Sequence, residues 1–301
     1  MMEKIKTILS LIIIVICLPY LITFVVQGDF LSPDGKKDQS PRAEKEARQE
    51  DTAKLISLLA AQMPVTFEKE ALKAQSVIAR TNLAYAKEND QAEPEGVSNE
   101  DLRKTLGAEE YQKRFELLKS CVEETSGEIL TYKEKAVQLP YHFVSAGQTR
   151  EPLLQDGKEK TPYLKSVSSI QDLKSERFLK VEFLSFKQLQ NKLESAFPDI
   201  KFENTKELEK LAEVTKRDSA SYVLSVQLPE KAVSGDDFAH ALSLNSACFS
   251  IKNIDKKVRI VTKGYGSGYG MSQFGANEMA KEGMDYQAIL DYYYDAKIGK
   301  L

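Results

Sequence analysis

The pattern of apolar and polar positions predicts two amphipathic helices in the first half of this 301-residue chain. Between Glu68 and Ala86, apolar side chains recur at the spacing of one helix face, and Pro64 stands shortly before them, where proline suits a helix entrance. Leu102 to Glu124 shows a second stripe of this kind. The positions counted on the two stripes are Ala71, Leu72, Ala74, Gln75, Ile78 and Ala79, then Leu102, Leu106, Tyr111, Phe115, Leu118 and Val122.

Short runs rich in β-branched and aromatic side chains predict strands in the rest of the chain. Two further helices are expected near the C-terminus, one near Ser272 to Lys281 and one over Tyr286 to Tyr294. Together these elements predict a mixed α+β fold of helices and short-stranded sheets. The predicted strands are Ile129–Tyr132, Val137–Phe143, Lys180–Phe186, Tyr222–Gln227 and Val258–Thr262.

An uninterrupted apolar run extends from Thr7 to Val26. It has about the 20 residues that a helix needs to cross the hydrocarbon core of a bilayer, and it holds no charge. The run is either a membrane span or a signal peptide. We favour a retained transmembrane anchor over 7–27, because the run is long and no Ala-x-Ala-like cleavage step follows it. Lys4 and Lys6 precede the run, so the positive-inside rule places residues 1–6 in the cytoplasm and the C-terminal part outside the cell membrane.

Charged residues dominate the next segment, which reads SPDGKKDQSPRAEKEARQED from Ser32 to Asp51. Such a composition buries too little apolar surface to offset the entropy of ordering, so we predict a disordered tether over 28–52. The chain is 42% hydrophobic, which is ordinary for a globular protein, and we expect an extracytoplasmic domain over 53–301. A formal net charge of -3 offers no basic surface of the kind that nucleic acids require, so no nucleic-acid partner is expected.

Four glycines occupy every second position from Gly264 to Gly270. Glycine is favoured where the backbone takes positive φ or where another group approaches closely, so this alternation predicts a built backbone site. The strand-like run VRIVTK leads into the glycines, and an amphipathic helix follows them. Their spacing lacks the fingerprint of a dinucleotide- or phosphate-binding loop, and no βαβ unit surrounds them, which argues against a nucleotide site.

Two blocks of sequence resemble the SpoIID/LytB family of bacterial cell-wall proteins. The segment GYGSGYGMSQFGANEMA, from Gly264 to Ala280, resembles the family's C-terminal signature, in which Gly-His-Gly runs into Gly-Met-Ser-Gln and an aromatic-Gly-Ala step. The second block, LLAAQMPVTFEKEALKAQSVIARTNLAYA, covers Leu58 to Ala86 in the family's order. Similar segments lie between them, TSGEILTYKEKAVQLPYHFVSAGQTREP and VSGDDFAHALSLNSACFSI, so the resemblance covers roughly Lys54 to Ile298.

The resemblance directs attention to Gln62. In active relatives the Ala-x-Met-Pro step carries a glutamate that acts as acid and base in a lytic transglycosylase of peptidoglycan. That carboxyl group protonates the glycosidic oxygen and then assists the muramyl 6-hydroxyl in attacking the anomeric carbon, and the carboxamide of Gln62 can do neither. Since acid and base catalysis contributes about 10² to 10⁴ in rate, the substitution predicts little turnover. A glutamine keeps the shape and can still hydrogen-bond a sugar.

Two other positions depart from the family pattern. Ser267 stands where the family has the histidine of Gly-His-Gly, so a hydroxyl replaces an imidazole. Ala239 stands where the family has an arginine, although the neighbouring His240 could partly replace it. A nearby acid could rescue catalysis, but Glu70 matches a structural helix-start position and Glu68 is expected to face solvent.

Several residues that match the family motifs are candidates for binding glycan. Ser272 and Gln273 are both candidates for contact with glycan. Ser272 could instead cap the following helix. Tyr265 and Tyr269 flank the glycines and could stack on sugar faces, whereas at least one of Tyr292, Tyr293 and Tyr294 is expected in the core. The complete set of predicted substrate-binding residues is Ser267, Tyr265, Tyr269, Ser272, Gln273, His142, Gln148 and Thr149.

Cysteine and histidine are sparse in the part expected outside the membrane. Cys121 and Cys248 either pair in an oxidising compartment or remain buried thiols. Some family members bind zinc through a histidine and two nearby cysteines, and His142 occupies the matching histidine position. No cysteine follows it nearby, and a zinc site needs three or four ligands, so we expect no metal and no cofactor.

These observations lead to one main hypothesis and two alternatives. The chain is expected to be a membrane-anchored, SpoIID/LytB-like protein of cell-wall remodelling, which the resemblance connects with sporulation and engulfment. It would bind peptidoglycan glycan strands, with cleavage impaired at Gln62, and would assist a partner cell-wall hydrolase or amidase. The alternatives are an active lytic transglycosylase that uses a displaced carboxylate and a domain that binds only protein partners.

Overall fold

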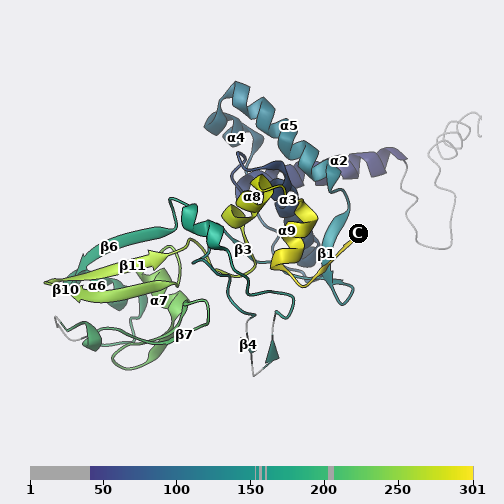
Figure 1. Cartoon of the computed structure of the whole chain (residues 1–301). Helices are drawn as coiled ribbons and strands as arrows, with labels where there is room; N and C mark the ends of the chain where they lie inside the picture. Colours follow the sequence, from purple (N-terminus) through teal and green to yellow (C-terminus); the bar gives the residue numbers. More distant parts are fainter. Residues whose placement is uncertain (1–40, 153, 156–157, 160, 203–206, 301) are drawn as a thin grey trace, which may run out of the picture. The chain divides into compact units, whose positions relative to one another are not determined.

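The structure, a computed structural model, describes residues 41–152, 154–155, 158–159, 161–202 and 207–300. Contacts divide the chain into residues 1–48 and residues 49–301, and every element below lies in the second part except the start of helix α2. The described residues form helices and several small sheets (Figure 1), which confirms the predicted α+β class.

The predicted anchor over 7–27 lies outside the described residues. Within the ranges that the structure describes, no helix is both long and apolar enough to cross a bilayer. Helix α2 (Pro41–Gln62) begins inside the segment 28–52 for which composition predicts a tether, and the earlier part of that segment is also outside the described residues. The anchor, the tether and the domain boundaries therefore stay predictions.

Helix α3 (Lys69–Glu88) lies at the centre of the first hydrophobic cluster. It contacts α5, α8, α9 and β1, and Figure 1 shows α8 and α9 beside it. Strand β1 is the middle strand of a sheet ordered β13-β1-β2. We call α3, the elements that it contacts and those named in the next sentence the helical lobe. Its further members are α4 (Asn99–Leu106), α5 (Ala108–Glu124), β1 (Glu128–Tyr132), β2 (Lys135–Ala136), β3 (Tyr141–His142), η1 (Ile170–Lys174), β12 (Met271–Ser272), α8 (Gln273–Lys281), α9 (Tyr286–Tyr293) and β13 (Lys297–Lys300).

A second hydrophobic cluster lies within residues 179–263, which we call the sheet lobe. One antiparallel sheet is ordered β10-β11-β6 and another β7-β8-β9, with α6 and α7 packed against them. The elements of this lobe are β6 (Leu179–Ser185), α6 (Phe186–Ala196), η2 (Leu208–Lys210), β7 (Glu213–Arg217), β8 (Val223–Gln227), β9 (Ala232–Ser234), α7 (Gly235–Leu242), β10 (Phe249–Ile254) and β11 (Lys257–Lys263). A short pair, β4 (Leu154–Gln155) and β5 (Lys158–Glu159), lies outside both lobes.

Three predicted elements differ from those in the structure. The single helix predicted over 102–124 is wrong, because Gly107, at a φ of +78°, ends α4 and begins α5. The strand predicted over 137–143 is reduced to the two residues of β3, which pair in parallel with β12. The strand predicted to reach Phe186 ends at Ser185, whose side chain forms a reciprocal capping box with Gln188 and starts α6.

Candidate functional site

The glycine loop, residues 264–270, joins β11 of the sheet lobe to β12 of the helical lobe. All four of its glycines have positive φ, which confirms the prediction that the backbone requires them. None of the four can take a Cβ without a clash, and the contacts are tightest at two of them. A Cβ on Gly270 would lie 1.9 Å from the carbonyl oxygen of Pro140, and a Cβ on Gly268 would lie 2.4 Å from the ring of Tyr222. The backbone of the loop therefore packs closely against neighbouring residues, which leaves no room for side chains at these positions.

Gln62 ends helix α2 and meets the amides of two residues distant in sequence. Gln75 Nε2, on α3, donates to Gln62 Oε1 at 3.0 Å. Gln273 Nε2, at the start of α8, donates to the Gln62 carbonyl oxygen at 2.7 Å and to Gln75 Oε1 at 3.2 Å. The structure thus brings together the two sequence blocks that resemble the family. This chain of hydrogen bonds consists of carboxamides, and the Gln62 carboxamide keeps its N–H groups as donors.

The two acids nearest in sequence are occupied elsewhere or exposed. Glu70 Oε1 forms an ion pair with Lys73 Nζ at 2.8 Å, and Glu70 Oε2 accepts a hydrogen bond from the Tyr286 backbone N–H at 3.0 Å. The Glu68 side chain is exposed, and its backbone N–H donates to Asn277 Oδ1 at 2.7 Å. Both oxygens of Glu70 are therefore occupied, and its Oε2 joins α3 to the start of α9.

Ser272 is a buried helix cap joined to a buried acid. Its Oγ accepts from the Gly275 N–H at 3.2 Å and donates to Asp172 Oδ1 at 2.8 Å. The backbone N–H of Ser145 donates to Asp172 Oδ2 at 2.7 Å. Burial raises the pKa of Asp172 although these hydrogen bonds oppose the shift. Glycan contact by Ser272 and Gln273, both buried, stays a prediction.

His142 is buried in β3 with one ring nitrogen unpaired. Its Nδ1 lies 3.0 Å from the carbonyl oxygen of Tyr269, an acceptor, so Nδ1 carries the proton and donates. Its Nε2 has no hydrogen-bond partner among the described residues. Burial lowers the pKa of His142 to about 4, which keeps the ring neutral near pH 7. A neutral imidazole supports the loop as a donor to Tyr269.

The three predicted contact residues inside the glycine loop differ in accessibility. Tyr265 is 40% exposed, and its ring meets Phe143 edge-on at 6.1 Å between centroids. Tyr269 is half-buried, with the guanidinium of Arg150 4.4 Å from its ring centroid. Ser267 is exposed, and its Oγ accepts from the Tyr269 N–H at 3.3 Å. Tyr265 thus offers the more exposed aromatic side chain. A guanidinium lies near both rings, since that of Arg177 is 5.7 Å from the Tyr265 centroid.

Thr149 and Gln148 hold a neighbouring backbone segment. Thr149 Oγ1 donates to the carbonyl oxygen of Lys165 at 2.9 Å and accepts from the Val167 N–H at 2.8 Å. Gln148 Nε2 donates to Ser166 Oγ at 3.0 Å. These contacts give both residues a structural role, and their contact with a glycan stays a prediction.

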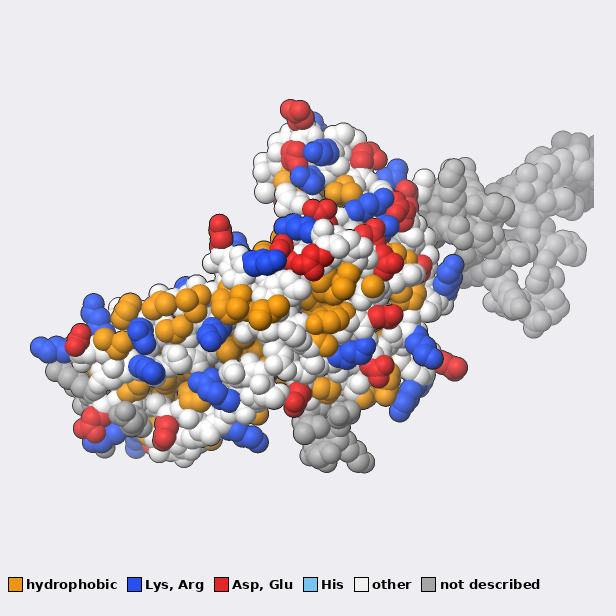
Figure 2. Space-filling model, viewed as in Figure 1, with side chains coloured by type: hydrophobic (Ala, Val, Ile, Leu, Met, Phe, Trp, Pro, Cys, Tyr) orange, Lys and Arg blue, Asp and Glu red, His pale blue; other side chains and the backbone are white. Residues whose placement is uncertain are grey.

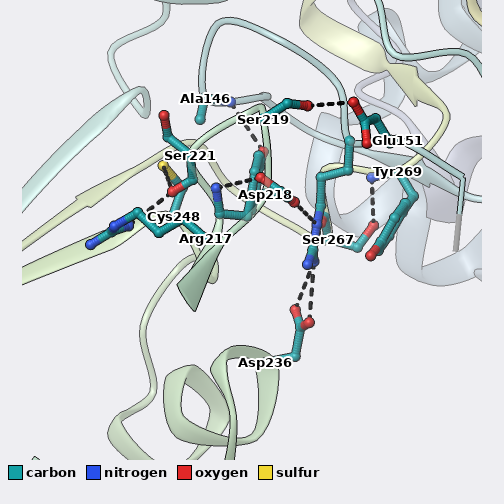
Figure 3. Close-up of polar contacts among 12 residues, drawn as sticks. Ala146, Glu151, Arg217, Asp218, Ser219, Ser221, Asp236, Cys248, Ser267 and Tyr269 are labelled. Carbon is teal, nitrogen blue, oxygen red and sulfur yellow. Dashed lines mark hydrogen bonds and ion pairs between the residues drawn. The ribbon is translucent and has the colours of Figure 1, made fainter. Parts of the chain in front are cut away.

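Arg150, the residue after Thr149, was not predicted as a site residue from the sequence. Its guanidinium is buried, with Nε 2.9 Å from Asp218 Oδ2 and Nη1 3.1 Å from Asp236 Oδ2. In Figure 3, dashed lines mark the contacts that Asp218 and Asp236 of the sheet lobe make close to Ser267 and Tyr269. Arg150 Nη1 also donates to the Ser267 carbonyl oxygen at 3.4 Å, and its backbone N–H donates to that of Gly268 at 2.8 Å. The acids that it meets are about 70 to 90 residues away in sequence, which no local pattern reveals.

Gln75 and Asp172 were also missed as site residues. A polar residue on the otherwise apolar stripe of α3 was the available signal for Gln75. Asp172 lies in a short 3₁₀ helix, where a single acid in a loop gives no such signal. At the positions of the other departures, Ala239 packs in the core of the sheet lobe and His240 is exposed.

Both described cysteines are buried and unpaired, which selects the second of the two predicted alternatives for Cys121 and Cys248. Burial raises the pKa of Cys121 to about 12, so this thiol stays protonated at neutral pH. Among residues 41–300, with the short gaps left aside, no group of three or more His, Cys, Asp or Glu side chains is arranged to hold a metal ion. The expected lack of a metal stays a prediction.

The chain is similar in sequence to several known proteins. The family model for stage II sporulation protein, SpoIID, matches residues 50–132. Stage II sporulation protein D of Bacillus subtilis (strain 168) is 32% identical over 254 residues, which cover 80% of this chain and 71% of the relative. The protein of the same name from Bacillus amyloliquefaciens is 32% identical over 256 residues, with the same coverage. The amidase enhancer of Bacillus subtilis (strain 168) is 43% identical over 54 residues, 18% of this chain and 8% of that protein.

Proposed function

Because the chain belongs to the stage II sporulation protein D family, we propose that it binds peptidoglycan glycan strands at the cell membrane and cleaves them poorly or not at all. Family membership supports a cell-wall function connected with sporulation. The proposal adds a single-pass anchor at 7–27 with a cytoplasmic N-terminus, and a glycan-binding site around Gln62 and the glycine loop.

The observation that carries this proposal is the set of hydrogen bonds at Gln62. Its Oε1 accepts from the Gln75 carboxamide and its backbone oxygen accepts from that of Gln273, so neutral amides hold both the side chain and the backbone of this residue. A carboxamide has no acidic proton for a leaving sugar and no basic oxygen to remove one from a hydroxyl. Its free N–H groups can still donate to a sugar oxygen, which supports binding without turnover.

The exposed residues of the glycine loop supply the proposed binding surface. Tyr265 presents an aromatic side chain, and such rings combine apolar area with a polar hydroxyl, as sugar faces and edges require. Ser267 adds an exposed hydroxyl two residues away. We propose that these groups hold the glycan while Gln62 contacts the sugar beside the glycosidic bond.

A bound but uncut strand suits the role of an assistant to another enzyme. One relative carries the name amidase enhancer, and it matches this chain over 54 residues. We extend that role to this protein and propose that it presents glycan strands to a partner cell-wall hydrolase or amidase.

The test compares cleavage and retention for the full chain. Purified peptidoglycan is incubated with the wild type and Gln62→Glu, and 1,6-anhydro-muropeptides are measured by mass spectrometry. Sedimentation with insoluble sacculi measures binding for the wild type, Tyr265→Ala and a control, Met284→Ala, whose side chain is equally exposed in the helical lobe. We expect retention without anhydro products for the wild type and weaker retention for Tyr265→Ala alone.

Two results would contradict the proposal. Anhydro products from the wild type above a heat-inactivated control would indicate an active transglycosylase with a displaced carboxylate. Failure of the folded wild type to sediment with sacculi would remove glycan binding and favour a domain that binds protein partners.

A further inference from the structure

Strand β6 presents a row of apolar side chains to solvent. Leu179, Val181 and Phe183 are between 47% and 54% exposed, and as alternate residues they share one face of the strand. Figure 2 shows hydrophobic side chains gathered along the border of the sheet lobe that carries β6. Contiguous exposed apolar surface on a soluble domain commonly marks an interaction site.

Strand β6 is also an open edge of its sheet. It pairs with β11 at all seven positions without a bulge, and no other described strand pairs with its far side. Alternate backbone N–H and C=O groups of β6 therefore face away from β11. Proteins usually protect such an edge with proline, a bulge or outward charges. Strand β6 has no proline and no bulge, and its two charged side chains, Lys180 and Glu182, lie on its other face and pair with each other. The apolar face therefore leaves the edge able to accept another strand.

The sheet around this edge is basic. Cross-strand pairing places Lys263, Val261 and Arg259 opposite Leu179, Val181 and Phe183, on the same face. In the described residues Lys252, Arg259 and Lys263 have no ion-pair partner, and Arg259 Nε is buried without a hydrogen-bond partner. The only acid on the three strands, Glu182, pairs with Lys180. The basic residues of β6, β10 and β11 are Lys180, Lys252, Lys257, Arg259 and Lys263.

From these observations we propose that β6 is a docking edge for an extended segment of a protein partner whose apolar and acidic side chains lie together on one face of the added strand, at every second position. Main-chain pairing with β6 supplies affinity, and the apolar row with its basic neighbours selects the side chains. The proposal stands independently of the proposed glycan function.

Two other occupants fit the surface less well. A bilayer would cover the apolar row but leave the open backbone groups of β6 facing hydrocarbon without partners. A second copy of the chain, paired edge to edge through β6, would bring the same unpaired cations near one another, which like-charge repulsion opposes. An acidic strand satisfies the backbone, the apolar row and the charges together.

The experiment uses the purified full chain and a synthetic peptide in which valine and glutamate take turns at every second position, with threonine between them, so that both lie on one face of the added strand. A second peptide, with lysine in place of glutamate, tests the charge. Fluorescence anisotropy measures affinity, and hydrogen exchange locates the protected amides. The variants are Val181→Glu, Arg259→Gln and a control, Met284→Glu, which adds the same charge at a side chain 41% exposed in the helical lobe.

We expect the glutamate peptide to bind, to protect alternate amides of β6 and to lose at least about tenfold in affinity with Val181→Glu, and less with Arg259→Gln. Met284→Glu should bind as the wild type does. Equal binding of the lysine peptide, protection elsewhere, or no binding of either peptide would overturn the proposal. Sedimentation also measures binding to phosphatidylglycerol vesicles and self-association of the chain. If Val181→Glu abolished only one of these and left peptide binding unchanged, the proposal would be overturned as well.

Discussion

His142 is a point where a single proton would disturb the fold. Its Nδ1 already donates to Tyr269, so a second proton would have to enter on Nε2, which is buried and has no partner in the described structure. Burial accordingly lowers the pKa of His142 to about 4 from an ordinary value of about 6.5. The folded chain therefore resists a protonation that the unfolded chain accepts.

This difference predicts a pH dependence of stability with a definite sign. Below about pH 6.5 the unfolded chain binds a proton that the folded chain does not, so the contribution is complete above that pH and is lost as the pH falls toward 4. Between pH 7.5 and 4.5 the free energy of unfolding should fall by about 2 to 3 kcal/mol from this residue. Urea unfolding of the wild type and His142→Gln at both pH values measures it.

The variant should show a shallower decline than the wild type. The matched control is His240→Gln, which replaces the chain's other histidine at an exposed position of α7 and should keep the wild-type decline. Equal declines for the wild type and His142→Gln would refute the assignment.

Gly270 tests how tightly the glycine loop is packed. Its φ is +67°, and an added Cβ would lie 1.9 Å from the Pro140 carbonyl oxygen. Gly270→Ala combines left-handed strain of roughly 1 to 2 kcal/mol with a backbone clash, so we expect a loss of more than about 3 kcal/mol in unfolding free energy. Gly283→Ala is the control, because its φ is +94° but no atom lies within 4 Å of the added Cβ.

The control should lose only the strain contribution, and chemical denaturation distinguishes the two variants. Similar losses for both would mean that the loop adjusts around residue 270 and that close packing does not explain its glycine.

At the scale of elements, the sequence predicted the helices whose position depends on the spacing of nearby apolar residues. Helix α3 and the helix after the glycine loop were found from apolar spacing, because both pack apolar side chains into the first hydrophobic cluster, although residues 74–81 of α3 are buried on every side. Strand β3 was overestimated because β-rich composition does not reveal a partner strand, and here that partner is only two residues long. The break at Gly107 depends on a single left-handed residue inside an otherwise regular stripe.

Ser272 shows how one side chain can join a helix start to the rest of the site. Its Oγ caps α8 and also donates to buried Asp172. Ser272→Ala removes a cap, which costs about 1 kcal/mol, and deprives a buried carboxyl of a donor, which costs about 1 to 3 kcal/mol more. We expect a total loss of about 2 to 4 kcal/mol in thermal or urea unfolding.

Ser98→Ala provides the matched control for that experiment. Ser98 caps α4 in the same way, accepting from the Asp101 N–H at 3.0 Å and donating to Asp101 Oδ2 at 2.6 Å, but both residues are exposed. Its loss should be about 1 kcal/mol. If both variants lost the same amount, the hydrogen bond to Asp172 would contribute nothing beyond the cap.

At the scale of the molecule, the described part of residues 49–301 contains two large hydrophobic clusters and a small third one of three buried residues, and a few polar groups join the two large ones. Of the candidate site, the sequence predicted Gln62 and the glycine loop, since both lie within motifs. It missed Arg150, Asp218 and Asp236, because a motif names residues in order and cannot say which distant acids a buried cation will meet. Long-range pairing of this kind depends on the tertiary fold, which local propensity does not encode.

Arg150 therefore offers the test of how the sheet lobe and the helical lobe are joined. It binds Asp218 and Asp236 from the sheet lobe and the carbonyl oxygens of Ser267 and Gly268 in the glycine loop. Arg150→Met keeps much of the volume but leaves the carboxylate of Asp218 without its cation. Removal of one partner from a buried pair costs about 3 to 5 kcal/mol, so the unfolding temperature should fall.

The loss should also separate the lobes, because the two clusters would then share fewer contacts. In Arg150→Met, calorimetry should resolve two transitions where the wild type has one, and hydrogen exchange should accelerate in residues 264–270 before either core. Lysine in Arg150→Lys keeps the charge but lacks the planar fork that reaches two carboxylates. The unfolding temperature of this variant should therefore lie between those of the wild type and Arg150→Met. A single transition at the wild-type temperature in Arg150→Met would mean that the hydrophobic contacts alone couple the lobes, and that the guanidinium serves only to orient Tyr269 beneath it.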